Sequence, residues 1–370
     1  MHNKEITVEG LPFRISLEKP VFRYPGNPLL CSSDVNRVWI RPEHQVVTVH
    51  NAGIARYDGG VIMLFRSHLR NGISVIGMAE SHNGIDNWKI MPAPVLKPCA
   101  SNDRFAPGVD PARQVENEAG GVEDPRISQI GDTYYITYSA YHGKVSDRVR
   151  VSLATTTDFR HYIRYGPLVD IDMRNVVLFP ERIRGSYYAL MRPNDHPEGT
   201  HIGGIFREIV LAKTDSLTSN DWHIFETPVM RQTGGPSPFS HKIGPGAPPV
   251  HTKYGWLSIF HGVRSTMDGN PYVLGVAFHD TDDPLRVAVS NIPILFPTRA
   301  DCRVAEDEYI HVPQVVFCCG ALRREDGTIM IYYGGNDTVM NLAFSHEDIL
   351  HELVTRFPQD PLTGVPTYNY

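Results

Sequence analysis

The segment GGVEDPRI, residues 120–127, places two consecutive acids between glycines and a proline. A carboxyl group on such a restricted segment can serve as a general acid when a substrate binds beside it. Asp124 is the better candidate of the two acids, because the residue before a proline is disfavoured in the helical region and is expected to be extended. Taken alone, the segment also fits a charged turn that Glu123 and Arg126 brace.

Four basic residues lie beside apolar runs farther along the chain. Arg174 and Lys242 precede such runs, and Arg192 and His261 follow them. If the fold gathers these residues, they repel one another unless an anion lies among them. Phosphate is the natural candidate because its charge and its oxygens suit arginine, although sulfate or a substrate carboxylate would satisfy the same charges. The sequence has no glycine-rich phosphate loop, so we expect side chains to hold the anion.

One acid together with a basic pocket predicts a particular reaction. Glycoside hydrolysis ordinarily needs two carboxylates, one as acid and one as base or nucleophile. Phosphate is itself a nucleophile, so an enzyme that cleaves a glycoside with phosphate needs only one carboxylate. Further polar residues lie at comparable edges of apolar runs: Asn51, Arg66, Asn175 and Asp337.

Five similar segments predict the elements that would position these residues. Each segment has the pattern strand, short turn, strand, and the turns lie at Asp58, Gly131, Gly185, Tyr254 and Asp326. A further β run follows each hairpin, and long amphipathic helices are scarce. We therefore predict an all-β fold, a five-bladed β-propeller that forms a single domain over residues 1–370. A pair of β-sandwiches is the alternative, but it would not naturally give five like units.

Composition and charge argue against several other classes of protein. The net charge of -6 and the absence of long charge runs argue against nucleic-acid and anionic-membrane partners. No apolar run is long enough to cross a bilayer, and the first ten residues lack the apolar core of a signal peptide, so we expect a cytoplasmic protein. The cysteine and histidine spacings match no metal site and no disulfide framework, so we expect no bound metal. The oligomeric state stays open, a homo-oligomer included.

The motifs resemble those of one known family. HNAG, GVEDPRI, RNVVLFPERIRGSYYALMRP, KIGPGAPPV, IFHG and YYGGND follow the order and spacing found in glycoside hydrolase family 130, the β-mannoside phosphorylases. The resemblance implies a five-bladed β-propeller that cleaves a β-mannoside with inorganic phosphate and inverts the anomeric centre to give α-mannose 1-phosphate. Inorganic phosphate is then a co-substrate, the partner is a small carbohydrate, and no cofactor is implied.

The resemblance also implies a role for each candidate residue. Asp124 matches the catalytic aspartate, which in the family mechanism passes its proton through the mannose 3-hydroxyl to the glycosidic oxygen. The implied phosphate-binding residues are Arg174, Asn175, Arg192, Lys242, His261 and Tyr272. The implied mannose-binding residues are Asn51, Arg66 and Asp337.

The family also contains hydrolases, and its members differ in their substrates. The hydrolases lack much of the basic set that this sequence keeps, so phosphorolysis is the expected activity. The overall length and the segment HNAGIARYDGG resemble the branch that acts on β-1,2-mannobiose and short β-1,2-mannooligosaccharides. Mannosyl-glucose, mannosyl-N-acetylglucosamine and β-1,4-mannooligosaccharides are alternative substrates, and a non-catalytic carbohydrate-binding propeller is the alternative of another class. We expect the insertions at 99–119 and 194–207 to select the leaving group.

Overall fold

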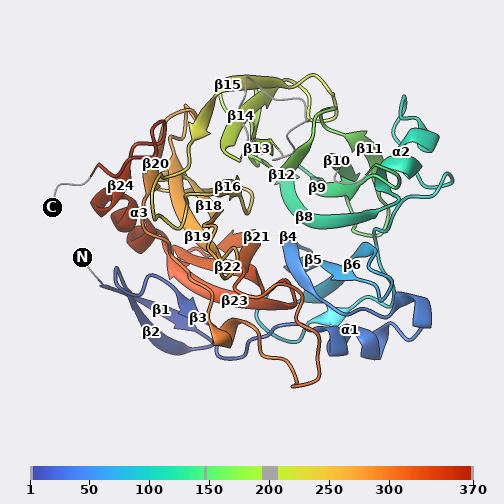
Figure 1. Cartoon of the computed structure of the whole chain (residues 1–370), viewed down its shortest axis with the longest axis horizontal. Helices are drawn as coiled ribbons and strands as arrows, with labels where there is room; N and C mark the ends of the chain where they lie inside the picture. The colour runs from blue at the N-terminus through green and yellow to red at the C-terminus, as the bar shows by residue number, and fades with distance from the viewer. Residues whose placement is uncertain (1–2, 146–147, 194–206, 368–370) are drawn as a thin grey trace.

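The structure is a computed structural model that describes residues 3–145, 148–193 and 207–367. Strands dominate these residues, as Figure 1 shows, so the predicted all-β class is confirmed. The helices in this part of the chain are α1 (Ser32–Val38), α2 (Pro111–Glu118), α3 (Glu347–Arg356) and the 3₁₀ turns Pro42–His44 and Arg299–Asp301. Within the described ranges no helix has the length and apolar character needed to span a membrane.

Most of the described strands form five successive antiparallel units, here called units one to five, and one parallel bridge between Ser74 and Gly121 joins units one and two in a single sheet. Unit one contains β4 (His50–Tyr57), β5 (Gly60–His68), β6 (Ser74–Ser81) and β7 (Lys89–Ile90). Unit two contains β8 (Gly121–Ile130), β9 (Thr133–Tyr141), β10 (Val149–Thr156) and β11 (Ile163–Pro167). Unit three contains β12 (Met173–Leu178), β13 (Tyr187–Pro193), β14 (Ile209–Thr214) and β15 (His223–Met230).

Units four and five depart slightly from this plan. Unit four contains β16 (Lys242–Pro245), β17 (Val250–Thr252), β18 (Gly255–Val263), β19 (Tyr272–His279), β20 (Val287–Ser290) and β24 (Pro358–Gln359). Both β16 and β17 pair with β18. Unit five contains β21 (Val316–Arg323), β22 (Thr328–Gly335), β23 (Val339–His346) and the N-terminal β3 (Phe22–Arg23). The pairing of β3 with β23 joins the two ends of the chain in one sheet. A separate hairpin consists of β1 (Asn3–Val8) and β2 (Leu11–Ser16).

The five predicted hairpins all form, and their turns explain why. In unit one Tyr57 pairs with Gly60, so Asp58 and Gly59 are the two turn residues, and both have positive φ. Positive φ at both central residues matches the twist of the flanking strands and favours aspartate or asparagine followed by glycine. In unit three Arg184 and Gly185 form the same kind of turn between Ile183 and Ser186.

The buried core lies between neighbouring units rather than in one central mass. Separate apolar clusters join unit one to unit two, two to three, three to four, and four to five. A further cluster packs Ile54 and Met63 of unit one against Met330 and Leu342 of unit five. The units therefore contact one another in cyclic order. The first strands β4, β8, β12, β16 and β21 lie around the middle of the view in Figure 1.

Candidate active site

Asp124 lies at a β-bulge in β8, where the pairing with β9 shifts between Glu123 and Arg126. Its φ is 49°, in the left-handed region, so the predicted extended geometry is wrong. The proline rule disfavours the right-handed helical region, but here the extra residue of the bulge selects the left-handed one. Aspartate tolerates this region better than most residues. A strained position of this kind is often found at a functional site.

The same bulge recurs at the same place in two other units. Asn51 in β4 and Asn175 in β12 also follow a register shift, with φ values of 49° and 56°. The residues just before them, His50 and Arg174, pair with Arg66 and Arg192 of the next strands. Three units thus present a short polar side chain from an equivalent left-handed position, and these are predicted site residues.

The carboxylate of Asp124 is held by groups from unit one. Its Oδ1 accepts hydrogen bonds from Asn51 Nδ2 and from Arg66 Nη1, each at 3.0 Å. Burial opposes ionisation, but the charges of Arg66 and Arg126 and the bond from Asn51 outweigh it, so the pKa of Asp124 is lowered. Among the described residues no hydrogen bond reaches Oδ2, which leaves one carboxylate oxygen for a ligand.

Arg66 binds both acids of the GGVEDPRI segment. Its Nη2 lies 2.7 Å from Glu123 Oε1, and Ser74 Oγ donates to the same oxygen at 2.7 Å. Burial disfavours the charged guanidinium, but the carboxylates of Glu123 and Asp124 prevail and raise the pKa of Arg66. Glu123 therefore holds Arg66 in place, consistent with the brace expected from the sequence.

Asp337 belongs to the same group of charges. It follows β22 in a turn with φ 47°, and burial raises its pKa to about 7, with Asp124 and Glu123 adding to the effect and Arg66 opposing it. The neighbouring Gly334 has no room for a Cβ, because Asn51 fills that space. The three predicted mannose-binding residues therefore lie around Asp124.

The predicted phosphate-binding residues gather in units three and four. Arg174 and Arg192 are direct partners on β12 and β13, and the Arg174 guanidinium lies 5.3 Å from the centre of the Tyr141 ring. Gly244 lies between Arg192 and His261, since an added Cβ would lie 2.6 Å from His261 Cε1 and 3.0 Å from Arg192 Cδ.

Lys242 and Tyr272 complete this group. Lys242 Nζ lies 5.4 Å from the centre of the Tyr272 ring, whose centre is 5.8 Å from that of His261. Burial lowers the pKa of His261 well below its usual value, and the charges of Arg192, Arg126 and Lys242 lower it further. His261 is therefore neutral at pH 7. Of the four basic residues that the sequence predicted, three are cations.

Arg126 connects Asp124 to the predicted phosphate-binding group. Its side chain is 1% exposed and donates to the Asp124 carbonyl at 2.8 Å, to Asn175 Oδ1 at 2.9 Å and to the Gly246 carbonyl at 3.1 Å. Asn175 Nδ2 in turn lies 3.5 Å from His261 Nε2. A continuous chain of polar contacts thus runs from Asp124 through Arg126 and Asn175 to His261.

Comparison with known proteins identifies the family. The family model described as beta-1,4-mannooligosaccharide phosphorylase, Glyco_hydro_130, matches residues 18–356. The chain belongs to glycoside hydrolase family 130. This family-130 chain is 32% identical over 299 residues to a 1,2-beta-oligomannan phosphorylase from Thermoanaerobacter sp. (strain X514), covering 78% of this chain and 87% of the relative.

Two further relatives of this family-130 chain come from one species. The beta-1,2-mannobiose phosphorylase of Listeria innocua is 30% identical over 379 residues, covering 90% of this chain and 98% of the relative. The solved structure of a Listeria innocua beta-1,2-mannobiose phosphorylase with beta-1,2-mannobiose superposes with a TM-score of 0.73 and 26% identity, covering 90% of this chain and 99% of that one. The resemblance inferred from the motifs is confirmed.

Two residues near the site were not among the sequence candidates. Tyr141 lies beside Arg174, and burial raises its pKa to about 12, helped by Glu123. Phe317 packs against His261, with ring centres 4.5 Å apart, and lies 5.7 Å from the Arg126 guanidinium. By register, Ser139 in unit two corresponds to Arg66 in unit one and Arg192 in unit three. Tyr141 lies two residues beyond Ser139 at the end of β9, so a comparison of the strand ends could have identified Tyr141. Phe317 has no comparable signal.

Proposed function

We propose that this chain is an inverting β-mannoside phosphorylase that transfers the non-reducing mannosyl residue to inorganic phosphate. One arrangement carries the proposal: Asp124, which Asn51 and Arg66 hold, is joined through Arg126 to a separate basic group. Family membership supports the enzyme class, since the matching model and the relatives described above are phosphorylases. One catalytic acid beside a phosphate-binding group is sufficient because phosphate supplies the nucleophile that a hydrolase must make from water.

The proposed roles follow from this arrangement. Arg174, Asn175, Arg192, Lys242, His261 and Tyr272 hold phosphate, and Asn51, Arg66 and Asp337 hold the mannose ring. A phosphate oxygen forms a bond to the anomeric carbon while the glycosidic bond breaks. The proton of Asp124 passes through the mannose 3-hydroxyl to the departing oxygen, which gives α-mannose 1-phosphate and a shortened sugar.

The ionisation of Asp124 must change on substrate binding for this reaction to proceed. Its pKa is lowered in the structure, so Asp124 is ionised at pH 7 when no substrate is bound. Bound sugar excludes water from the carboxyl group, and bound phosphate adds negative charge nearby. Both effects favour the protonated acid. The neutral His261 suits the same pocket, because it can donate a hydrogen bond to phosphate without adding a further charge.

We further propose β-1,2-mannobiose or short β-1,2-mannooligosaccharides as substrates. The two curated relatives described above, at 32% and 30% identity, act on β-1,2-linked mannosides by name. The description of the family model names β-1,4-mannooligosaccharides, which are the alternative. Of the two insertions expected to select the leaving group, only 99–119 is described, since 194–206 lies outside the described residues.

We also propose that the five units form the blades of one five-bladed β-propeller domain. The cyclic order of the interfaces supports this, as does the pairing of the N-terminal strand β3 with β23, which adds a strand from before unit one to the last unit. In a propeller the first strand of every blade lines the central channel. This places Asn51, Asp124 and Asn175, on three of these strands, around one ligand. No cofactor beyond the co-substrate phosphate is proposed.

Incubation of the protein with β-1,2-mannobiose, with and without phosphate, tests the function. We expect mannose 1-phosphate to appear only with phosphate. Release of free mannose at the same rate without phosphate would instead establish a hydrolase. Running the reaction in reverse from α-mannose 1-phosphate against a panel of acceptor sugars then identifies the linkage and the leaving group.

A further inference from the structure

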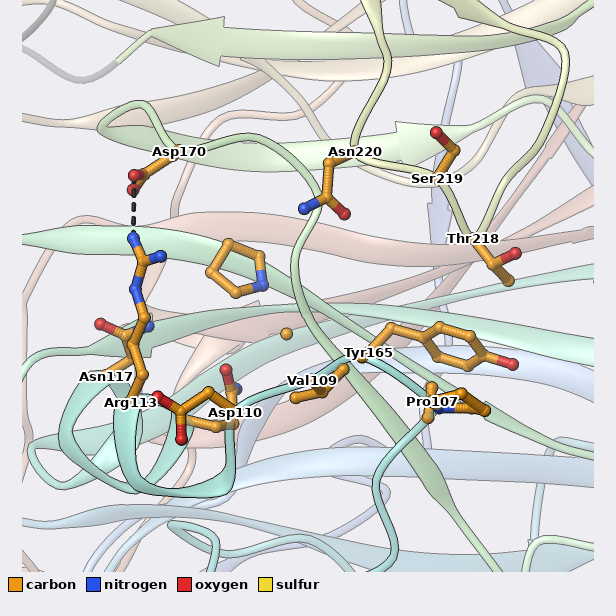
Figure 2. Close-up of a pocket in the computed structure, with 15 residues that line it drawn as sticks. Pro107, Val109, Asp110, Arg113, Asn117, Tyr165, Asp170, Thr218, Ser219 and Asn220 are labelled. Atoms are coloured by element: carbon orange, nitrogen blue, oxygen red, sulfur yellow. Dashed lines mark hydrogen bonds and ion pairs between the residues drawn. The ribbon is translucent and has the colours of Figure 1, made fainter.

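A pocket of about 690 Å³ lies between units two and three and contains none of the candidate active-site residues. We call it the rim pocket. Three segments line it, as Figure 2 shows: residues 106–117 with α2, residues 165–170 at the end of β11 and just beyond it, and residues 218–220 between β14 and β15. Its volume lies within the range of small-molecule binding sites. The segment 106–117 belongs to an insertion that we expected to influence substrate choice.

Asn117 gives the rim pocket a buried polar group with unused hydrogen-bonding capacity. The residue is 5% exposed, and no hydrogen bond joins its side-chain amide to another described residue. Its amide therefore keeps donors and an acceptor that a ligand in the pocket can use. The Asn220 amide lies on the other side of the pocket, above Val109 and Tyr165 in Figure 2.

Each charged side chain that lines the rim pocket has an ion-pair or a hydrogen-bond partner. Arg113 Nη2 lies 2.9 Å from Asp170 Oδ2, and Arg150 Nε lies 3.1 Å from Asp170 Oδ1. Asp110 caps α2 by accepting a hydrogen bond from the Ala112 amide at 2.9 Å. With these charges balanced, the pocket favours a neutral ligand over a phosphate or a cation.

The remaining lining suits a polyhydroxylated ligand. Pro107, Val109, Tyr165 and Pro167 offer apolar surface, and Asn117 and Asn220 offer amides that both donate and accept. A sugar ring matches this combination, because it has C–H faces together with hydroxyl groups that both donate and accept. We propose that the rim pocket is a second carbohydrate-binding site, which takes a short neutral oligosaccharide. The choice of β-mannooligosaccharide as the ligand rests on the proposed function.

Calorimetric titration of the full chain with β-1,2-mannotetraose, in the absence of phosphate, tests this proposal. We expect two classes of site. The double substitution Asn117→Ala and Asn220→Ala should weaken one class at least tenfold, and Arg66→Ala should weaken the other. Asn102→Ala is the matched control, because Asn102 is exposed in the same insertion and does not line the pocket.

Turnover separates a failed pocket proposal from a failed function. The double variant should release mannose 1-phosphate from β-1,2-mannobiose at the parent rate, which also shows that it is folded. A single class of site, or a titration that the double substitution leaves unchanged, would overturn the rim-pocket proposal whether or not phosphorolysis is observed. Absence of mannose 1-phosphate from the parent chain would count against the proposed function alone.

Discussion

Arg126 and Asn175 join two different units through a hydrogen bond of 2.9 Å between Nη2 and Oδ1. The same guanidinium donates to the carbonyl of Asp124, so a single side chain holds the backbone of the proposed acid and a residue of the proposed phosphate-binding group. The planar fork of arginine is suited to holding several acceptors at once, and lysine cannot reproduce it. The distance between acid and nucleophile in the proposed reaction therefore depends on Arg126.

Arg126→Lys should lower kcat/KM by about 10- to 100-fold, the loss expected for one or two hydrogen bonds from a charged donor. The KM for phosphate should rise as kcat falls, because Asn175 and Asp124 lose a common support. Steady-state kinetics with varied phosphate and varied β-1,2-mannobiose measure both effects.

Arg164→Lys provides the control for this prediction. Arg164 is also buried and donates to Glu118 Oε2 at 2.7 Å, but it has no contact with the site. Its substitution should lower thermal stability without changing the KM for phosphate. If both variants change phosphate KM equally, Arg126 acts only through the stability of the fold.

Asp124→Asn should reduce kcat by about 10³-fold, within the range expected for loss of a general acid. Sugar binding should largely persist, because the asparagine oxygen can still accept from Asn51 and Arg66. Single-turnover rates and calorimetric binding of β-1,2-mannobiose separate these two quantities. Glu123→Gln is the matched neighbour, and its expected loss is about tenfold, since it weakens only the support of Arg66. A larger loss from Glu123→Gln than from Asp124→Asn would reassign the acid.

Local sequence patterns were sufficient to predict the hairpins but not the geometry of the acid. The turn at Asp58 and Gly59 depends on residues that are adjacent in sequence, so the turn type can be predicted from the sequence. The left-handed Asp124 depends on a bulge, which is a property of the pairing between β8 and β9. The neutral state of His261 likewise depends on burial and on arginines brought in by other units.

Contacts between distant segments also could not be predicted from local sequence patterns. The two-residue strand β3 is too short to carry an alternation, yet it completes unit five. Arg126 was expected to brace its own turn, and its bonds to Asn175 and Gly246 exist only because three units approach one another. The sequence could predict that the polar residues at strand ends lie close together, but it could not predict which residues they bind.

Asp337→Asn should change how stability depends on pH. Burial, with the charges of Asp124 and Glu123, raises the pKa of Asp337 to about 7, whereas an unfolded aspartate has a pKa of about 3.9. The folded state therefore holds an extra proton between these values, so the contribution of Asp337 to stability is full at low pH and is lost as pH rises through 7. Asparagine mimics the neutral form at every pH.

Urea unfolding at pH 5 and pH 8 measures this effect. Relative to the parent chain, Asp337→Asn should gain about 2 to 3 kcal/mol of unfolding free energy between the two pH values. Asp268→Asn, at an exposed loop position, should show no such gain. If the stability difference between Asp337→Asn and the parent stays constant with pH, Asp337 does not carry the extra proton.

Gly244→Ala should weaken phosphate binding without disturbing the mannose site. A Cβ there would lie 2.6 Å from His261 Cε1, 2.7 Å from Nε2 and 3.0 Å from Arg192 Cδ, so the imidazole must shift and the Arg192 side chain must give way slightly. We expect the KM for phosphate to rise about tenfold, a loss comparable to one hydrogen bond to a charged group. Calorimetric affinity for β-1,2-mannobiose should stay within about twofold of the parent. Gly234→Ala is the control, because a Cβ at Gly234 meets open space. An unchanged phosphate KM in a folded Gly244→Ala protein would mean that His261 and Arg192 do not hold the phosphate.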